Sequence, residues 1–431
     1  MNLLSRSPLT LSLFPLTLFL LAIMPSPATA QSTDRALLRA KRLLRTTPLI
    51  DGHNDLPWAI RERKEAPRDV AAYDLRTRTS GHTDLARLAQ GQVGAQFWSI
   101  YIPGEIKDSG YARVQLEEFD LARRIIARYP ERLALALTAN DIERNFKRGR
   151  VASLLGMEGG HAIENSLGAL RSYYDLGARY MTLTHNVTLD WADAALDSVR
   201  NNGLSEFGRE VVREMNRLGM LVDLSHVSPA SMSDALDVTE APVIFSHSSA
   251  RALTEHGRNV PDSILKRLPK NGGLVMVTFV PAFVSPEVAA WEAQAQEQST
   301  AIKQAVSDTA EQTRRFEEWK ATHARPSATL KQVADHIEHV RKMAGPNHVG
   351  IGSDFDGIDT TPEGLEDVSK FPELFAELVR RGWTDSDLKK LAGQNLLRAL
   401  RGAEGAAARL QKSRQPSTKT IEQLDGVKPK T

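Results

Sequence analysis

Short apolar runs alternate with longer segments of helical periodicity along most of this chain. Each run consists mainly of Val, Ile, Leu, Met and Phe, and polar residues follow where it stops. A short, continuous apolar run is typical of a β-strand that is buried on both faces. We predict eight such strands, at about 48–52, 95–101, 151–156, 179–184, 219–224, 241–246, 272–279 and 348–353.

The segments between these runs show the 3.6-residue spacing of amphipathic helices. The clearest cover residues 111–129, 205–218, 330–344 and 363–381, and a short basic helix is expected over 31–45. Alternating strands and helices indicate parallel β/α units, and eight units predict a closed α/β barrel, the (β/α)8 or TIM-type fold. A doubly wound open sheet is the alternative, but DGHNDLP follows the first strand instead of the glycine-rich loop of that fold.

One segment departs from the alternation. Residues 283–327, after the seventh predicted strand, are rich in Ala, Gln and Glu, and 292–322 has the pattern of a long polar helix. Loops that follow barrel strands lie on the active-site face. The insertion is therefore either a lid or an oligomer contact, or a solvated segment with no role in chemistry.

The first thirty residues resemble a secretory signal peptide. A nearly continuous apolar stretch covers 9–24, and Ala28-Thr29-Ala30 forms a small-x-small cleavage site before Gln31. An uncleaved membrane anchor is less favoured, because Pro15 interrupts a stretch that is already short for a membrane span. We expect an exported protein, periplasmic or secreted and without a membrane anchor after cleavage. Its parts would be a signal peptide (1–30), a barrel domain (31–405) and a polar C-terminal tail (406–431).

Composition limits the classes of partner. The 431 residues are 41% hydrophobic and 25% charged, with a formal net charge of +2, so no electrostatic case exists for nucleic acid. The absence of Cys excludes disulfides, which leaves the core and any bound metal to stabilise an exported chain. The sequence leaves a monomer and a homodimer equally open.

The most informative polar residues are those at the ends of the predicted strands. Strand carboxyl ends converge on one face of a barrel, so these side chains should meet there. Imidazoles and carboxylates suit zinc, and one carboxylate that bridges two ions can hold them about 3.5–4 Å apart for hydrolysis. Taken singly, each could instead be a turn or capping group. The residues are His53, Asp55, Glu158, His226, His247 and Asp354.

Three further positions have more than one interpretation. His185 follows the fourth predicted strand and would be an extra ligand, a group that stabilises a substrate oxyanion, or a structural histidine. Arg258 would select a substrate carboxylate or form a surface salt bridge. Asp354 and Asp356 in GIGSDFDG compete for the role of general base, and the glycine after Asp356 favours a turn there.

Nine ordered motifs between about residue 47 and residue 400 carry a resemblance. Together they resemble the membrane dipeptidase (renal dipeptidase) family of zinc peptidases, which have an amidohydrolase-type barrel. The motifs are IDGHNDLPW, GQVGAQFWS, GMEGGHAIE, THN, WADA, VDLSH, FSHSSARAL, GRNVPD and GIGSDFDGIDTTPEGLEDVSKFPEL.

The resemblance implies two zinc ions per chain and a role for each site residue. Glu158 would bridge the ions, the first completed by His53 and Asp55 and the second by His226 and His247. A metal-bridged hydroxide would attack dipeptides, with a D-residue tolerated at the C-terminal position. His185 would bind the scissile carbonyl oxygen, Arg258 the C-terminal carboxylate, and Asp354 would shuttle the proton, so that Glu158, His185 and Asp354 form the catalytic group.

Two alternatives to a dipeptidase remain. One is another amide hydrolase on the same barrel, such as an N-acyl amino acid deacylase or a lactamase-like enzyme, since Arg258 cannot distinguish these substrates. The other is a non-catalytic binding protein, but no expected ligand is missing from the sequence.

Overall fold

The computed structural model describes residues 34–106 and 110–426, and in this part eight parallel strands close into a barrel. Neighbouring strands pair in the order β1-β2-β4-β5-β6-β7-β8-β9, and β9 pairs back onto β1. The predicted (β/α)8 fold is confirmed. The barrel strands are β1 (Leu49–Asn54), β2 (Val93–Tyr101), β4 (Val151–Glu158), β5 (Ala178–Thr182), β6 (Leu221–Asp223), β7 (Ile244–Ser248), β8 (Leu274–Val277) and β9 (Val349–Ile351).

The barrel strands lie where the apolar runs predicted them, because their side chains are buried both inside the barrel and beneath the surrounding helices. A ninth strand, β3 (Leu133–Leu135), was not predicted. It pairs with the first residues of β4 (Val151–Ser153), just before β5 begins to pair at Leu155. A strand of three residues, two of them partly exposed, is too short to stand out in the sequence.

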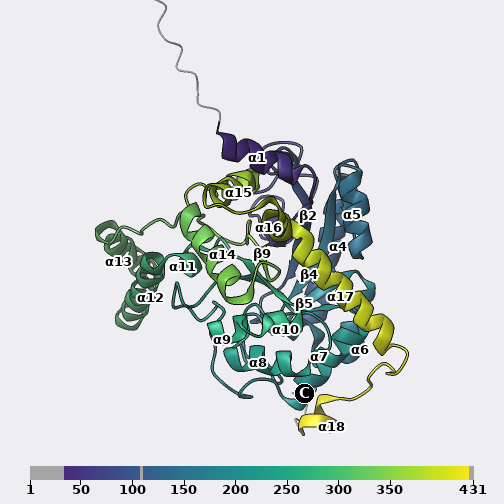
Figure 1. Ribbon diagram of the computed structural model, residues 1–431. Helices are drawn as coiled ribbons and strands as arrows, with labels where there is room; N and C mark the ends of the chain where they lie inside the picture. The colour runs from purple at the N-terminus through teal and green to yellow at the C-terminus, as the bar shows by residue number, and fades with distance from the viewer. Residues whose placement is uncertain (1–33, 107–109, 427–431) are drawn as a thin grey trace, which may run out of the picture. The chain divides into compact units, whose positions relative to one another are not determined.

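Helices surround the strands, as Figure 1 shows. The predicted helices 111–129, 205–218 and 330–344 are confirmed, whereas helix structure in the segment 363–381 begins only at residue 368. The helices other than those of the insertion and the C-terminal region are α1 (Arg35–Leu44), α2 (Leu56–Arg61), α3 (Leu85–Gln90), α4 (Tyr111–Arg128), α5 (Ala139–Lys147), η1 (Gly160–Ile163), α6 (Leu167–Asp175), α7 (Glu206–Leu218), α8 (Pro229–Val238), α9 (Asp262–Leu265), α10 (Leu268–Asn271), α14 (Leu330–Ala344), η2 (Val368–Lys370), α15 (Phe371–Arg380), α16 (Asp385–Lys389) and η3 (Lys390–Gln394).

The insertion after the seventh barrel strand, β8, contains α11 (Pro281–Val284), α12 (Pro286–Ala305) and α13 (Thr309–Thr322). The prediction of one long helix over 292–322 was therefore wrong. The helix breaks at Val306–Asp308, where the Asp308 side chain accepts from the backbone N–H of Glu311 and caps α13. The two helices pack as a hairpin to one side of the barrel (Figure 1), with the rings of Trp291 and Trp319 5.7 Å apart.

The C-terminal region packs on the barrel more closely than a polar tail would. The boundary that we placed at residue 405 falls inside α17 (Asn395–Leu410), and a further helix, α18 (Ile421–Asp425), follows. The Asp425 carboxylate accepts from the hydroxyl of Ser205 at 2.6 Å, at the start of α7.

The predicted signal peptide lies outside the described residues. Among the residues that the structure describes, no helix combines the length and apolarity that crossing a membrane requires.

Candidate metal centre and active site

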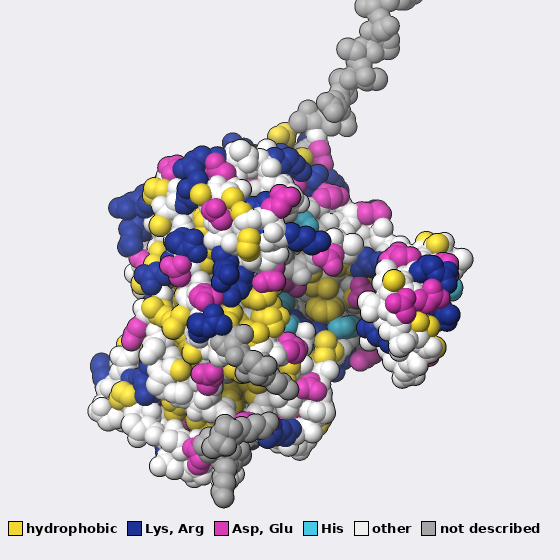
Figure 2. Space-filling model, turned by 180° about the vertical axis from the view of Figure 1, so that it is seen from behind, with side chains coloured by type: hydrophobic (Ala, Val, Ile, Leu, Met, Phe, Trp, Pro, Cys, Tyr) yellow, Lys and Arg dark blue, Asp and Glu magenta, His cyan; other side chains and the backbone are white. Residues whose placement is uncertain are grey.

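The eight residues predicted to form the site lie together at the carboxyl ends of the barrel strands. They border a cavity of about 410 Å³, except His53, which lies buried just beneath it. Figure 2 shows this hollow, with cyan and yellow side chains in it, between the body of the barrel and the protruding lobe of the insertion. The strand ends place the site residues as follows: His53 in β1, Asp55 just after it, Glu158 at the end of β4, His185 after β5, His226 after β6, His247 in β7, Arg258 in the loop after β7, and Asp354 after β9.

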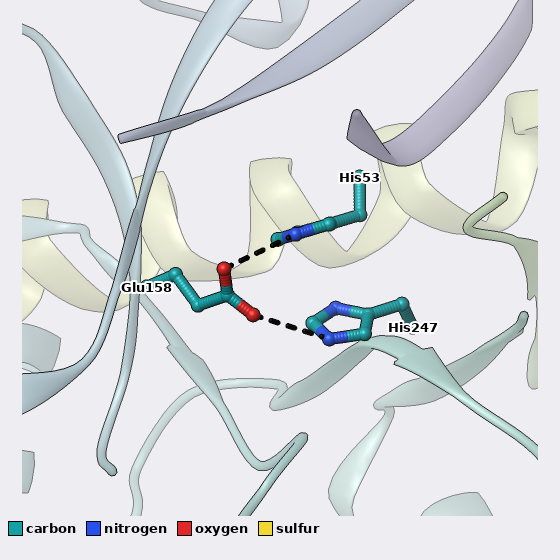
Figure 3. Close-up of side chains that lie close together, drawn as sticks. All are labelled: His53, Glu158 and His247. Carbon is teal, nitrogen blue, oxygen red and sulfur yellow. Dashed lines mark ion pairs between the residues drawn. The ribbon is translucent and has the colours of Figure 1, made fainter. Parts of the chain in front are cut away.

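Glu158 lies at the centre of the group and divides it in two. Its Oε2 atom lies 3.4 Å from Nε2 of His53, whose Nε2 is also 3.3 Å from Oδ2 of Asp55. Its Oε1 atom lies 2.9 Å from Nε2 of His226 and 3.3 Å from Nε2 of His247. Figure 3 shows the carboxylate between two of the rings, with one oxygen directed to each. A single carboxylate thus faces two separate sets of potential metal ligands.

The outer nitrogens of two rings show which tautomer each ring adopts. Nδ1 of His53 lies 2.9 Å from the hydroxyl oxygen of Tyr180, whose own hydrogen is directed to the carbonyl of Gly52. Nδ1 of His226 lies 3.1 Å from the side-chain oxygen of Asn186. Both Nδ1 atoms therefore donate, and in the neutral form of each ring the Nε2 atom carries a lone pair directed into the site.

His247 is held in the same tautomer by a serine. Its Nδ1 lies 2.8 Å from the Ser246 hydroxyl, which donates to the Asp223 carboxylate and so accepts from the ring. In their neutral forms, three imidazoles therefore direct Nε2 lone pairs at one carboxylate.

These lone pairs require cations. The Nε2 atoms of His226 and His247 lie 2.9 Å apart with no hydrogen available between them, and buried Nε2 of His53 has no hydrogen-bond partner. Such an arrangement of acceptors is unfavourable unless positive charge lies among them. Three groups of side chains have ligand atoms within 4.8 Å of one another and could hold metal ions: His53, Glu158 and His247; Glu158, His185 and His226; and His53, Asp55 and Asp354.

The ionisation behaviour of the buried groups agrees with a cation site. Burial raises the pKa of Glu158, but the positive charge of His53 outweighs this effect and holds the pKa well below its usual value. The pKa of His53 is raised well above its usual value, so a bound metal ion would take the place of the proton on this ring. Burial lowers the pKa of His226 and of His247 well below the usual value, which keeps these rings neutral. Anionic carboxylate and neutral imidazole are the forms that bind metals.

On the open side of the cavity, Arg258 is the one cationic lining residue in the described part of the chain. Its side chain is buried, its Nη1 atom has no hydrogen-bond partner, and its guanidinium lies over the ring of Phe283 at 5.3 Å. Burial lowers the pKa of Arg258 to about 10, so the group stays charged at neutral pH. The surface salt bridge that the sequence left open is not formed, and the guanidinium is available for an anion.

The two competing aspartates have different surroundings. Asp354 lines the cavity, with Oδ1 3.9 Å from Nε2 of His53, and burial raises its pKa to about 8. Asp356 lies outside the cavity lining, and its Oδ1 accepts from the backbone N–H of His82 at 2.7 Å. Asp356 thus lies in a turn, as the glycine after it indicated, and its carboxylate links this turn to the segment that contains His82.

The sequence did not reveal the residues that orient the ligands. These residues reach the ligand side chains, or one another, only once the barrel has formed. They are Tyr180, Asn186, Ser246 and Asp223. Asn186 follows His185 and Ser246 precedes His247, but adjacency to a predicted site residue does not distinguish an orienting group from an ordinary polar residue.

The family model described as membrane dipeptidase, peptidase family M19, matches residues 37–414. The chain belongs to this family. The resemblance seen in the motifs is confirmed, and membership makes the chain a metal-dependent dipeptidase.

Solved structures agree with the fold of a membrane dipeptidase. The probable dipeptidase PvdM from Pseudomonas aeruginosa has a TM-score of 0.75 and 22% identity over 87% of this chain and 100% of its own. The dipeptidase AC, a metallo-peptidase of family M19, has a TM-score of 0.69 and 26% identity over 84% and 99%. A metallo-peptidase from Rhodobacter sphaeroides, liganded with a phosphinate mimic of the dipeptide L-Ala-D-Ala, has a TM-score of 0.67 and 24% identity over 83% and 99%.

Proposed function

We propose that this member of the family is a two-zinc dipeptidase that accepts a D-residue at the C-terminal position of its substrate. The observation that carries the proposal is the position of Glu158, whose two carboxylate oxygens face separate ligand sets. His53 and Asp55 would complete one ion site, and His226 and His247 the other. Imidazole and carboxylate ligands with substrate-accessible space beside them are typical of catalytic zinc.

Bound zinc would supply a Lewis acid and lower the pKa of water enough to provide a nucleophile at neutral pH. The residues of the chain would then place the substrate. Arg258 binds the C-terminal carboxylate, because its buried guanidinium has an unused N–H. His185, whose ring centre lies 4.8 Å from that of Tyr101, would present its Nε2 to the scissile carbonyl oxygen.

Asp354 would move the proton. Its carboxylate lines the cavity beside the ligands, where it can take a proton from water and return it to the leaving amine. Within this scheme Glu158 contributes by holding both halves of the site together.

The tolerance for a D-residue follows from how the C-terminal end would be held. Arg258 recognises the carboxylate, while the neighbouring wall consists of apolar side chains that make no directional contact, among them Leu196, Val280 and Phe283. Inverting the C-terminal α-carbon would move its side chain across this wall without breaking a hydrogen bond. The relative liganded with a mimic of L-Ala-D-Ala is in keeping with such a substrate.

The apolar wall also favours a second candidate. An N-acyl amino acid could place its carboxylate at Arg258 and its acyl chain against Trp58 and Ile358, which line the same cavity. The test is metal analysis of the purified protein together with hydrolysis assays on L-L and L-D dipeptides and N-acyl amino acids. Two zinc ions per chain with turnover of both dipeptide classes is expected, whereas one ion, or turnover of N-acyl substrates alone, would overturn the proposal.

We further propose that the protein is exported, with the mature chain beginning at Gln31. The support is the apolar segment 9–24 and the Ala28-Thr29-Ala30 cleavage site. Mass spectrometry of the protein from its native host should give a mass that begins at Gln31, and an intact Met1 would contradict this.

A further inference from the structure

Two buried aspartates lie close to the site, Asp223 as the last residue of β6 and Asp51 within β1. Asp223, at the end of β6, receives four hydrogen bonds and is fully buried. Its Oδ1 accepts from the backbone N–H groups of Ser225 at 3.1 Å and Ser246 at 2.8 Å. Its Oδ2 accepts from the hydroxyls of Thr182 and Ser246, both at 2.6 Å. An ionised carboxylate can only accept, so the Ser246 hydroxyl hydrogen is committed to it.

That commitment determines the hydrogen on the neighbouring histidine ring. With its hydrogen directed to Asp223, the Ser246 oxygen can only accept from Nδ1 of His247, 2.8 Å away. Nδ1 of His247 therefore carries the hydrogen, and Nε2 is left as a lone pair 3.3 Å from Oε1 of Glu158. The backbone N–H of His247 donates to Ser225, which fixes the position of the ring further.

We propose that Asp223 is a positioning residue that acts through Ser246 to fix the metal-binding tautomer of His247. This inference rests on the proposed two-metal site and concerns the half of it that His226 and His247 complete. Partners that orient the far nitrogen of a ligating histidine commonly change metal affinity by 10–100-fold. Here Asp223 would act indirectly, because the Ser246 hydroxyl lies between its carboxylate and the ring of His247.

Asp51 provides a matched comparison on the other side of the barrel. It is also fully buried, and it also binds both the backbone N–H (2.7 Å) and the hydroxyl (2.6 Å) of a serine, Ser353. The hydroxyl of Ser353 accepts from the backbone N–H of Phe355 and contacts no histidine ring. Asp51 also accepts a hydrogen bond from the backbone of His53, so replacing it removes a buried carboxylate beside the other half of the site without changing the partner of any histidine ring.

Replacing Asp223 by Asn should allow the ring of His247 to change tautomer. The two backbone N–H groups still require an acceptor, so the amide oxygen of the new side chain takes the place of Oδ1. The amide nitrogen then faces the Ser246 hydroxyl and donates to it. The Ser246 hydrogen becomes free to donate to Nδ1 of His247, and the ring hydrogen can move to Nε2, where it blocks metal binding.

The experiment compares the wild-type protein with Asp223→Asn and Asp51→Asn. Chelator competition measures zinc affinity at each site, and ¹⁵N NMR of histidine-labelled, metal-free protein reads the tautomer of His247. Asp223→Asn should weaken one of the two sites by about 10–100-fold and show hydrogen on Nε2, whereas Asp51→Asn should keep both sites and the Nδ1–H form.

Wild-type affinity at both sites in Asp223→Asn, or an equal loss in Asp51→Asn, would overturn the inference. If Asp223→Asn does not fold, Ser246→Ala removes the acceptor for Nδ1, and the same selective loss is expected. Two sites of wild-type affinity in Ser246→Ala would again overturn it. A wild-type protein that binds only one zinc would instead refute the proposed function, and the tautomer measurement, which needs no metal, keeps the two failures distinct.

Discussion

The Nε2 atoms of His226 and His247 lie 2.9 Å apart, and the contacts of both rings leave a lone pair on each. Two acceptors at this distance repel one another unless a cation lies between or beside them. The fold holds them there because β6 and β7 are neighbours and both residues follow short, fully buried segments of strand. The space between these two rings therefore suits a bound cation.

The first prediction concerns Glu158→Gln. An amide cannot bridge two cations as a carboxylate does, so both zinc ions should be lost or weakened together, and dipeptide hydrolysis should fall with them. Metal content by mass spectrometry and a hydrolysis assay measure the two effects. The control is Glu118→Gln, which changes a fully buried glutamate of α4 outside the site and should leave the metal content unchanged. Retention of both ions in Glu158→Gln would remove this residue from the centre.

The second prediction is a pH dependence of stability that originates at Glu118. Burial raises the pKa of its carboxyl to about 8, against an ordinary value of 4.5, despite the nearby Arg61. Between these values the folded chain holds a proton that the unfolded chain has lost, so this group makes stability fall as pH rises from 4.5 to 8. Above pH 8 the folded carboxyl is ionised as well, and the loss levels off.

Glu118→Gln should remove this dependence. Thermal unfolding of the variant and of the wild type between pH 5 and pH 9, under equal metal loading, should show a Tm difference that grows in favour of the variant up to about pH 8. Glu117→Gln serves as the control, since a hydrogen bond from Arg61 lowers the pKa of Glu117 and no such gain is expected there. A pH-independent difference for Glu118→Gln would show that its carboxyl titrates normally.

The barrel could be predicted from the sequence because its strands are buried on both sides and so appear as unbroken apolar runs. The same cause explains two errors. The β3 strand has only three residues, two of them partly exposed, and was too short to be recognised as a buried strand. The hairpin of α12 and α13 has an almost uniformly polar surface, with no buried residue in α13, so its break at Val306–Asp308 left no change in periodicity.

The site residues, too, could be predicted from the sequence only in part. Residues that end an apolar run, such as His53 and Glu158, were visible because a polar group at the rim of a barrel has few structural reasons to be there. Tyr180 and Asn186, which orient the rings, contact their histidines across 127 and 40 residues of sequence. The local sequence does not show which residues so far apart in the chain are in contact, and only the closed barrel brings these groups together.

The third prediction concerns Arg258→Ala. A charge-assisted hydrogen bond to the substrate carboxylate is worth about 1.5–3 kcal/mol, so KM for free dipeptides should rise roughly 10- to 150-fold. Dipeptide amides, which lack the carboxylate, should be affected much less. Arg251→Ala is the matched control, because Arg251 holds the same loop through the Gly257 carbonyl and does not line the cavity. Equal losses for both kinds of substrate in Arg258→Ala would make the arginine structural.

The fourth prediction separates the two aspartates of GIGSDFDG. Asp354→Asn keeps the size of the side chain but removes its ability to take a proton, so kcat should fall by about 10²–10⁴, the usual contribution of general acid–base catalysis. Metal content should change little, because Glu158 and its four partner ligands remain. Asp356→Asn should cost far less, since the amide oxygen can still accept from the backbone N–H of His82.

The pH profile of Asp354→Asn gives an independent reading of the same role. If the carboxyl at Asp354 moves the proton, the residual kcat should lose one ionisation that the wild-type profile shows, whereas the profile of Asp356→Asn should keep it. A merely structural aspartate would lower kcat without changing the shape of the curve. Should Asp356→Asn prove inactive and Asp354→Asn active, the base is Asp356, and the loop after β9 must then place that carboxylate in the cavity during turnover.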